Sequence, residues 1–208
     1  MNKMKQEELD LLIENHNKYI KALQNNETDG KKLMLDRIDF SNNNLSKLNF
    51  VDVYITDSIF NDTVLDGVNF GGAKIYDCKL NNMTFKNVNF GKAEFDFSYI
   101  KDSSFEDCFF TKVSSNQTLF ENLYFKSCKI NDVFSNSKIN YIHFENCDFN
   151  GVEFWKCIVQ GLQFTNSNFD VDDMIRKINK GTLDEPVIVD GEEAVNTFKE
   201  YSTGYTKS

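Results

Sequence analysis

An apolar residue returns at every fifth position over most of this 208-residue chain. In the segment FEDCFFTKVSSNQTLFENLYFKSCKI, residues 105–130, the period is broken only at Ser115. A period of five fits neither the 3.6 residues per turn of an α-helix nor the two-residue alternation of an ordinary strand. It predicts a chain that turns a corner every five residues.

The period extends over residues 33–170. Apolar side chains occupy the central position of nearly every five-residue unit, from Leu35 to Phe169, and small or apolar side chains such as Val53 lie two residues earlier. The other positions are mainly Asp, Asn, Lys, Glu, Gly and Ser. The spacing shortens once, to four residues, between Ile130 and Phe134, and there we expect a local bend or a tightened corner.

The repeated unit resembles that of the pentapeptide-repeat proteins, which is written A(D/N)LXX. The segments that match it closely are VNFGG (68–72), VNFGK (88–92), CDFNG (147–151) and SNFDV (167–171). The resemblance implies an all-β fold, a right-handed quadrilateral parallel β-helix of about seven coils with four units per coil. The central residue of each unit, and the one two before it, would point inward. At Ser115 we expect strain, a bulge or a buried water.

Three regions follow from these patterns. Residues 1–32 are expected to form an N-terminal capping helix over 6–24, where apolar residues follow helical spacing, and then a turn. Residues 33–170 form the solenoid. Residues 171–208 are expected to give a short cap helix over 171–180, an extended segment, a second helix over 192–201 and a frayed tail.

Composition limits the location and the partners. The net charge of −9 disfavours direct binding to nucleic acid or to an anionic membrane, because phosphate groups require a concentrated basic surface. The five cysteines include no CxxC pair, which favours a reducing compartment. The polar start and the lack of a long apolar run favour a soluble cytoplasmic protein.

No residue pattern indicates catalysis. Cys108, Cys128 and Cys147 should stack in consecutive coils, either as a metal or redox site or, more commonly, as small inward residues. His143 should point outward, away from Cys147. His16 lies on the apolar side of the capping helix, where we expect it to pack at a polar margin. We therefore expect no enzyme, no catalytic residue, no cofactor and no metal.

One outer face of the expected solenoid, whose central residues include Leu35, Ile55 and Ile75, is acidic. Its acidic residues are Asp36, Asp57, Asp77, Glu94, Asp96, Asp132 and Glu153, against the basic residues Arg37, Lys74 and Lys156. The same face and its next corner also carry aromatic residues at positions that should point outward, which is typical of a protein-interaction surface.

The candidate partner-binding patch consists of Tyr54, Tyr76, Phe97, Tyr99, Trp155, Asp57, Asp77, Glu94 and Asp96. The competing interpretation is scattered surface aromatics, or aromatics that cover the terminal segments.

Two functions fit these features. The first is a non-enzymatic protein–protein interaction scaffold, whose partner is an unidentified protein or a second copy in a homodimer. The resemblance implies the second, because some family members mimic duplex DNA, bind gyrase or topoisomerase IV, and inhibit these enzymes or protect them from quinolone-type agents. Two features favour the interaction scaffold. Lysines are mixed along three faces, and the chain has no large loop insertions.

Overall fold

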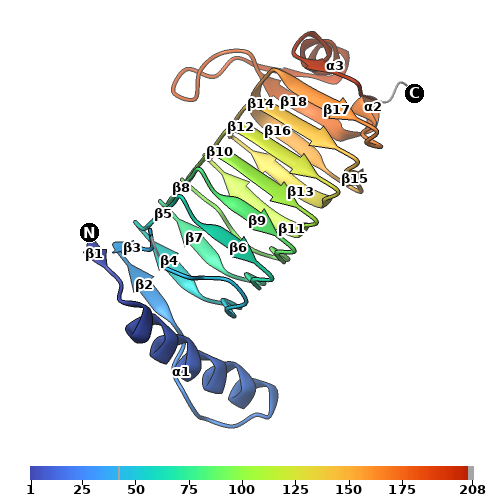
Figure 1. The fold of residues 1–208 in the computed structure, drawn as a ribbon. Helices are drawn as coiled ribbons and strands as arrows, with labels where there is room; N and C mark the ends of the chain where they lie inside the picture. Colours follow the sequence, from blue (N-terminus) through green and yellow to red (C-terminus); the bar gives the residue numbers. More distant parts are fainter. Residues whose placement is uncertain (42, 206–208) are drawn as a thin grey trace.

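The computed structural model describes residues 1–41 and 43–205. It is a parallel β-solenoid of about seven turns, with one helix at its N-terminal end and short helices near its C-terminal end (Figure 1). The fold class implied by the resemblance to pentapeptide-repeat proteins is confirmed. None of the helices within the described residues has the length and apolar character needed to cross a membrane.

Strands of the early turns are short, whereas most later strands run through a corner of the solenoid. The early strands are β1 (Asn2–Lys3), β2 (Met34–Asp36), β3 (Ile38–Asp39), β4 (Tyr54–Thr56), β5 (Ile59–Asn61), β6 (Val64–Asp66), β7 (Lys74–Tyr76), β8 (Lys79–Asn81) and β9 (Thr84–Lys86). The later strands are β10 (Tyr99–Glu106), β11 (Phe109–Asn116), β12 (Leu119–Lys126), β13 (Lys129–Ser135), β14 (Lys138–Glu145), β15 (Asp148–Phe149), β16 (Glu153–Gln160), β17 (Leu162–Thr165), β18 (Ile175–Asn179), β19 (Ile188–Asp190) and β20 (Ser202–Thr203). Ile55 pairs with Ile75 and Phe105 with Phe125, which is the spacing of four five-residue units.

Residues with a left-handed backbone conformation form the corners of the solenoid. In most of the described units the residue two positions after the central one has a positive φ, for example 48° at Asp57 and 54° at Asn82. Asp, Asn and Gly tolerate this backbone better than other residues do. Each unit therefore supplies one inward-facing extended stretch and one residue that turns the chain, which is why the period is five.

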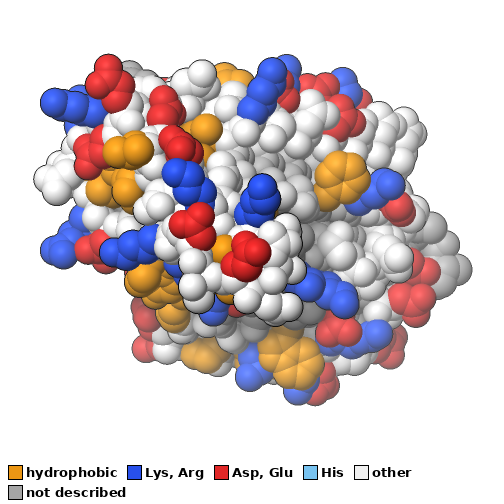
Figure 2. Space-filling model, turned by 90° about the horizontal axis from the view of Figure 1, so that it is seen from below, with side chains coloured by type: hydrophobic (Ala, Val, Ile, Leu, Met, Phe, Trp, Pro, Cys, Tyr) orange, Lys and Arg blue, Asp and Glu red, His pale blue; other side chains and the backbone are white. Residues whose placement is uncertain are grey.

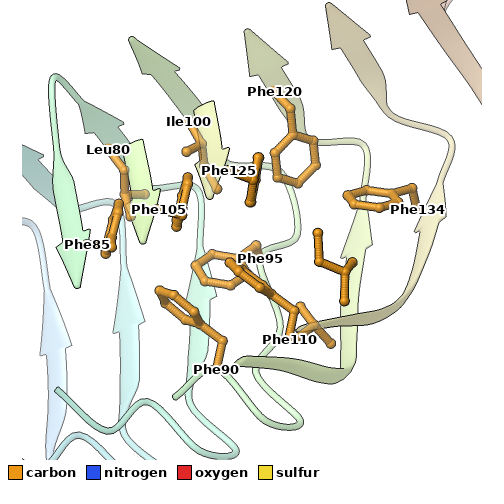
Figure 3. Close-up of a pocket in the computed structure, with 12 residues that line it drawn as sticks. Leu80, Phe85, Phe90, Phe95, Ile100, Phe105, Phe110, Phe120, Phe125 and Phe134 are labelled. Carbon is orange, nitrogen blue, oxygen red and sulfur yellow. The ribbon is translucent and has the colours of Figure 1, made fainter. Parts of the chain in front are cut away.

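Stacked rings fill the interior. Phe105 lies between Phe85 and Phe125, with ring centroids 4.5 Å from each, and Figure 3 shows these side chains pointing into the solenoid. A narrow apolar void of about 20 Å³ remains between the rings of the middle turns. Among the 20 phenylalanines, Phe97 and Phe109 are the two that stay exposed, each at 45%.

The four-residue unit tightens a corner, as the spacing predicts. Thr111 pairs with Asn131 and Val113 with Asp132, so the corner residue Lys112 has no counterpart in β13. A bulge, one of the three features expected at Ser115, is not seen at that residue. Ser115 itself pairs regularly with Phe134 and is fully buried.

The N-terminal helix α1 (Gln6–Gln24) has the predicted bounds and covers the first turn of the solenoid (Figure 1). His16 lies on the apolar side of the helix as expected, but it is fully buried rather than at a polar margin. Its Nε2 atom lies 2.7 Å from the Val51 carbonyl oxygen, and its Nδ1 atom accepts the Leu33 N–H at 3.1 Å. The imidazole thus joins the helix to the first turns.

The helix expected over 171–180 is also corrected. Only α2 (Val171–Met174) is helical, and β18 follows it. Phe154 pairs with Ile175 and Cys157 with Ile178, so β18 satisfies the backbone edge of β16 that a helix would leave open.

The helix α3 (Gly191–Glu200) closes the C-terminal end of the core (Figure 1). Its Phe198 is fully buried, and the ring stacks on that of Phe169 with centroids 5.5 Å apart. The expected frayed tail is wrong for its first residues, because Ser202 and Thr203 form β20 and pair with β17. Residues 206–208 lie outside the described part of the chain.

Candidate functional site

The acidic face is the side of the solenoid around the central residues Leu35, Ile55, Ile75, Phe95, Ser115, Phe134 and Phe154. Glu94 lies near its middle, where it accepts a hydrogen bond from the Tyr76 hydroxyl and pairs with Lys74 Nζ at 3.5 Å. Burial, followed by the hydrogen bond to Glu94, raises the pKa of Tyr76. The carboxylate and the phenol of the predicted patch therefore hold each other in place. The side chain of Asp132, assigned to this face from the sequence, lies outside the described residues.

Tyr54 and Tyr76 meet edge to face at the N-terminal part of the acidic face. Their ring centroids are 5.5 Å apart with the planes at 90°, a favourable arrangement for aromatic pairs. Both residues are half-buried. Asp96 follows along the face and accepts the Asn116 N–H at 2.9 Å. Burial is the main cause that raises the pKa of Asp96, and the nearby Glu94 adds to it.

At the corner next to this face, one residue from each successive turn stands in a straight row, which we call the corner ladder. Its members are Asp57, Asp77, Phe97, Gln117, Asn136 and Lys156, all with positive φ. A left-handed backbone costs a residue with a side chain beyond glycine about 1–2 kcal/mol. Phe97, with φ of 60°, keeps a large exposed ring at a position better suited to Asn or Gly. Non-glycine residues with positive φ occur at corners along the whole solenoid, so the feature particular to Phe97 among the ladder residues is its exposed phenyl ring.

Tyr99 and Trp155 occupy different surroundings. Tyr99 lies just past the corner from Phe97 and is exposed at 49%. Trp155 lies at the C-terminal end of the face, where Lys177 Nζ is 5.2 Å and Lys156 Nζ 5.9 Å from its ring centroid. The structure therefore places Trp155 between two lysines, apart from the carboxylates with which the sequence groups it.

A loop extends from the end of the solenoid between β18 and β19 (Figure 1). Together with Ile188, the first residue of β19, this loop makes up residues 180–188, which we call the arm. The buried Asn179 side chain holds its base, accepting the N–H groups of Gly181 and Val187 at 2.9 Å each and donating to the Thr182 carbonyl oxygen at 2.8 Å. A Cβ atom on Gly181 would lie 2.3 Å from the Glu185 carbonyl oxygen, so only glycine fits there.

The arm and the corner ladder enclose a groove of about 530 Å³. The residues that line it are Asp77, Phe97, Tyr99, Gln117, Asn136, Lys156, Asn179, Leu183, Asp184, Pro186 and Ile188. Three residues of the predicted patch, Asp77, Phe97 and Tyr99, thus face one groove. The other six lie on the acidic face and its corner outside the groove lining.

Sequence reasoning missed the arm as a wall of this site. The signal was present, because Leu183 and Ile188 are apolar in a segment outside the five-residue period, and Gly181 and Pro186 mark a turn. Its placement depends on β18 continuing the sheet, which the helix prediction excluded.

The cysteines and the histidine considered as possible metal or redox groups are a part of the core and a surface residue, respectively. Cys108, Cys128 and Cys147 are buried thiols, and contact with the Cys108 thiol, followed by burial, raises the pKa of Cys128 to about 12. His143 points outward, with Nε2 2.9 Å from Thr165 Oγ1. Within the described residues, no group of three or more His, Cys, Asp and Glu side chains is arranged to hold a metal ion.

Comparison with known protein families identifies the same five-residue repeat. Residues 35–72 match the family model described as Pentapeptide repeats, in 8 copies, and the resemblance seen in the sequence is confirmed. None of the curated proteins compared with the chain matches its sequence.

Solved structures similar to this one include QnrB1 and HetL. A trypsin-treated variant of QnrB1, a plasmid-mediated fluoroquinolone resistance protein, shares 18% identity over 67% of this chain and 70% of its own, with a TM-score of 0.35. HetL, a pentapeptide repeat protein involved in heterocyst differentiation regulation from the cyanobacterium Nostoc sp. strain PCC 7120, shares 9% identity over 74% of this chain and 82% of its own, with a TM-score of 0.26.

Proposed function

We propose that this chain, which carries pentapeptide repeats, is a non-enzymatic module that binds a protein partner through its acidic face and the groove beside it. The observation that carries the proposal is the position of Phe97. It is one of two exposed phenylalanines, its backbone is left-handed, and it lines a groove whose opposite wall is the arm, with the apolar residues Leu183 and Ile188. Exposed aromatic side chains at a concave surface are typical of interaction sites.

The acidic face offers further support. Tyr54 and Tyr76 are held by each other and by Glu94, so a partner would meet preformed side chains rather than mobile ones. Preformed surfaces bind with a smaller loss of conformational entropy. The partner is proposed to be another protein, and a second copy of this chain is an outcome that the test distinguishes.

Affinity capture with matched variants tests the proposal. Phe97→Ser and Trp155→Ala should each weaken the capture of a native partner by about tenfold or more, since aromatic anchors dominate such interfaces. Phe109→Ser is the control, because Phe109 is equally exposed at 45% on a different face. Sedimentation of the purified chain tells whether the partner is a second copy. Equal capture by the wild-type chain and both face variants would refute the proposal.

The alternative is a DNA-mimicking binder of gyrase or topoisomerase IV that inhibits the enzyme or protects it from quinolone-type agents. Its support is the net charge of −9 on a rod of stacked turns. Three ion pairs interrupt the negative surface: Lys74–Glu94 at 3.5 Å, Lys86–Glu106 at 3.6 Å and Lys101–Glu121 at 2.7 Å. Figure 2 likewise shows basic and acidic side chains interspersed on the face that it presents. A DNA mimic needs a continuous field of one sign, so we rank this function second.

A supercoiling assay separates the two functions. We expect the purified chain to leave gyrase supercoiling unchanged and not to compete with DNA for the enzyme. Inhibition that added DNA relieves would favour mimicry over the proposed role.

A further inference from the structure

We propose that the groove between the arm and the corner ladder binds an extended segment of the partner in which apolar side chains alternate with lysine or arginine. This inference rests on the proposed function and names the chemistry that the partner must present. It follows from the apolar walls, the unbalanced carboxylates and the rigidity of the groove.

Each of the two walls of the groove carries exposed apolar side chains. Phe97 and Tyr99 form one wall, exposed at 45% and 49%, and Leu183 and Ile188 belong to the other, exposed at 47% and 39%. A groove of about 530 Å³ lies between them, within the range of about 300–1,000 Å³ usual for ligand sites. Apolar side chains of a partner that enter this space would remove both walls from water.

The charge in the groove is negative. Asp77 and Asp184 line it, and neither belongs to an ion pair found within the described residues. The one lysine of the lining, Lys156, has its ammonium group 5.9 Å from the Trp155 ring centroid. Asp57 continues the row beyond Asp77. A cationic side chain beside the apolar ones would complement this surface.

The floor of the groove favours an extended segment. Gln117 and Asn136 stand in the straight corner ladder, where neighbouring turns are about 4.8 Å apart. Asn136 donates from Nδ2 to Asn116 Oδ1 at 2.8 Å, so the direction of its amide group is fixed. Side-chain amides offer both donors and acceptors, which an extended backbone can use along its length.

Both walls are fixed before a partner arrives. Asn179 ties the base of the arm with three hydrogen bonds, and the Lys180 N–H donates to the Val187 carbonyl oxygen at 2.8 Å. Phe97 projects from a corner whose backbone N–H donates to the Asn116 carbonyl oxygen of the next turn at 3.0 Å. A preformed groove loses little entropy on binding, so a short segment suffices as a ligand.

The test is fluorescence anisotropy of a labelled short peptide that alternates leucine and lysine between Gly-Ser ends, with the full chain as receptor. We expect this peptide to bind. Its leucine–glutamate and serine–lysine counterparts should bind more weakly, by about tenfold or more. Phe97→Asn should weaken binding by about tenfold or more. It should keep the melting temperature of the wild-type chain or raise it, because Asn tolerates a left-handed backbone.

Tyr141→Asn is the matched control. Tyr141 is also an exposed aromatic residue at a left-handed corner, with φ of 53°, but it does not line the groove. The inference is overturned if the leucine–lysine peptide fails to bind, if the serine–lysine peptide binds equally well, or if Tyr141→Asn weakens binding as much as Phe97→Asn.

A second variant separates this inference from the proposed function. Leu183→Ser changes an exposed residue of the arm and leaves the acidic face intact. Reduced capture of the native partner by this variant supports the groove. Capture that Leu183→Ser leaves unchanged and Trp155→Ala abolishes would overturn the groove while upholding the face.

Discussion

Two buried serines, Ser115 and Ser137, differ in what their hydroxyl groups bond. The Ser137 hydroxyl accepts the Thr118 N–H at 3.1 Å and donates to the Ser135 carbonyl oxygen at 2.8 Å. The Ser115 hydroxyl is buried without a hydrogen-bond partner within the described residues. An unmade buried hydrogen bond costs about 1–3 kcal/mol.

Ser115→Ala should therefore raise the free energy of unfolding, by about 1 kcal/mol, because it removes an unpaired hydroxyl from the core. Ser137→Ala should lower it by about 1 kcal/mol, because it leaves the Thr118 N–H unpaired. Urea denaturation measures both. A loss of stability in Ser115→Ala equal to that in Ser137→Ala would contradict the assignment.

His16 makes stability depend on pH. Burial is the main cause that lowers its pKa from 6.5, and a proton on Nδ1 would displace the Leu33 N–H. The unfolded chain binds that proton near pH 6.5, whereas the folded chain resists it. The stabilising contribution is thus present above about pH 6.5 and is lost as the pH falls below it.

We expect the melting temperature of the wild-type chain to decrease as the pH is lowered from about 7.5 to about 5.5. The fall should be smaller in His16→Gln, which cannot titrate in this range. His143→Gln should keep the wild-type slope, because His143 lies at the surface and is the second of only two histidines. Parallel pH profiles for the wild-type chain and His16→Gln would contradict the account.

Each turn of the solenoid depends on the ring stacks of its neighbours. Phe125 lies between Phe105 and Phe144, with centroid distances of 4.5 Å and 5.0 Å. Phe125→Ala should cost about 3–5 kcal/mol of unfolding free energy, as a large-to-small change in a packed core. Phe109→Ala, at an exposed ring, should cost less than about 1 kcal/mol. Equal losses in denaturant unfolding would refute the assigned register.

The elements differ in how far the sequence predicts them. The solenoid and α1 follow from local spacing, because a five-residue or helical period assigns each side chain to the inside or the outside. The segment after Met174 has no such period. Its apolar residues Ile175 and Ile178 fit a helix, yet they form β18 because the open edge of β16 needs hydrogen-bond partners. Contacts with a distant element decided this structure, and local propensity could not.

The candidate site shows the same division at the scale of the whole molecule. The period placed Tyr54, Tyr76 and Glu94 together on one face, because residues twenty apart stack in neighbouring turns. It could not place the arm over Phe97, since that contact joins segments with unrelated patterns. The face was therefore predictable from the sequence, and the groove required the structure.

The central claim is that the protein binds its partner on this side of the solenoid. The most direct measurement is site-specific photo-crosslinking in native cells, with a photoreactive phenylalanine analogue at position 117 or at position 122. Gln117 and Asn122 are exposed left-handed corner residues of the same turn, but only Gln117 lines the groove. The account predicts a discrete crosslinked partner from position 117 and none from position 122. No product from position 117, or the same product from both positions, would contradict it.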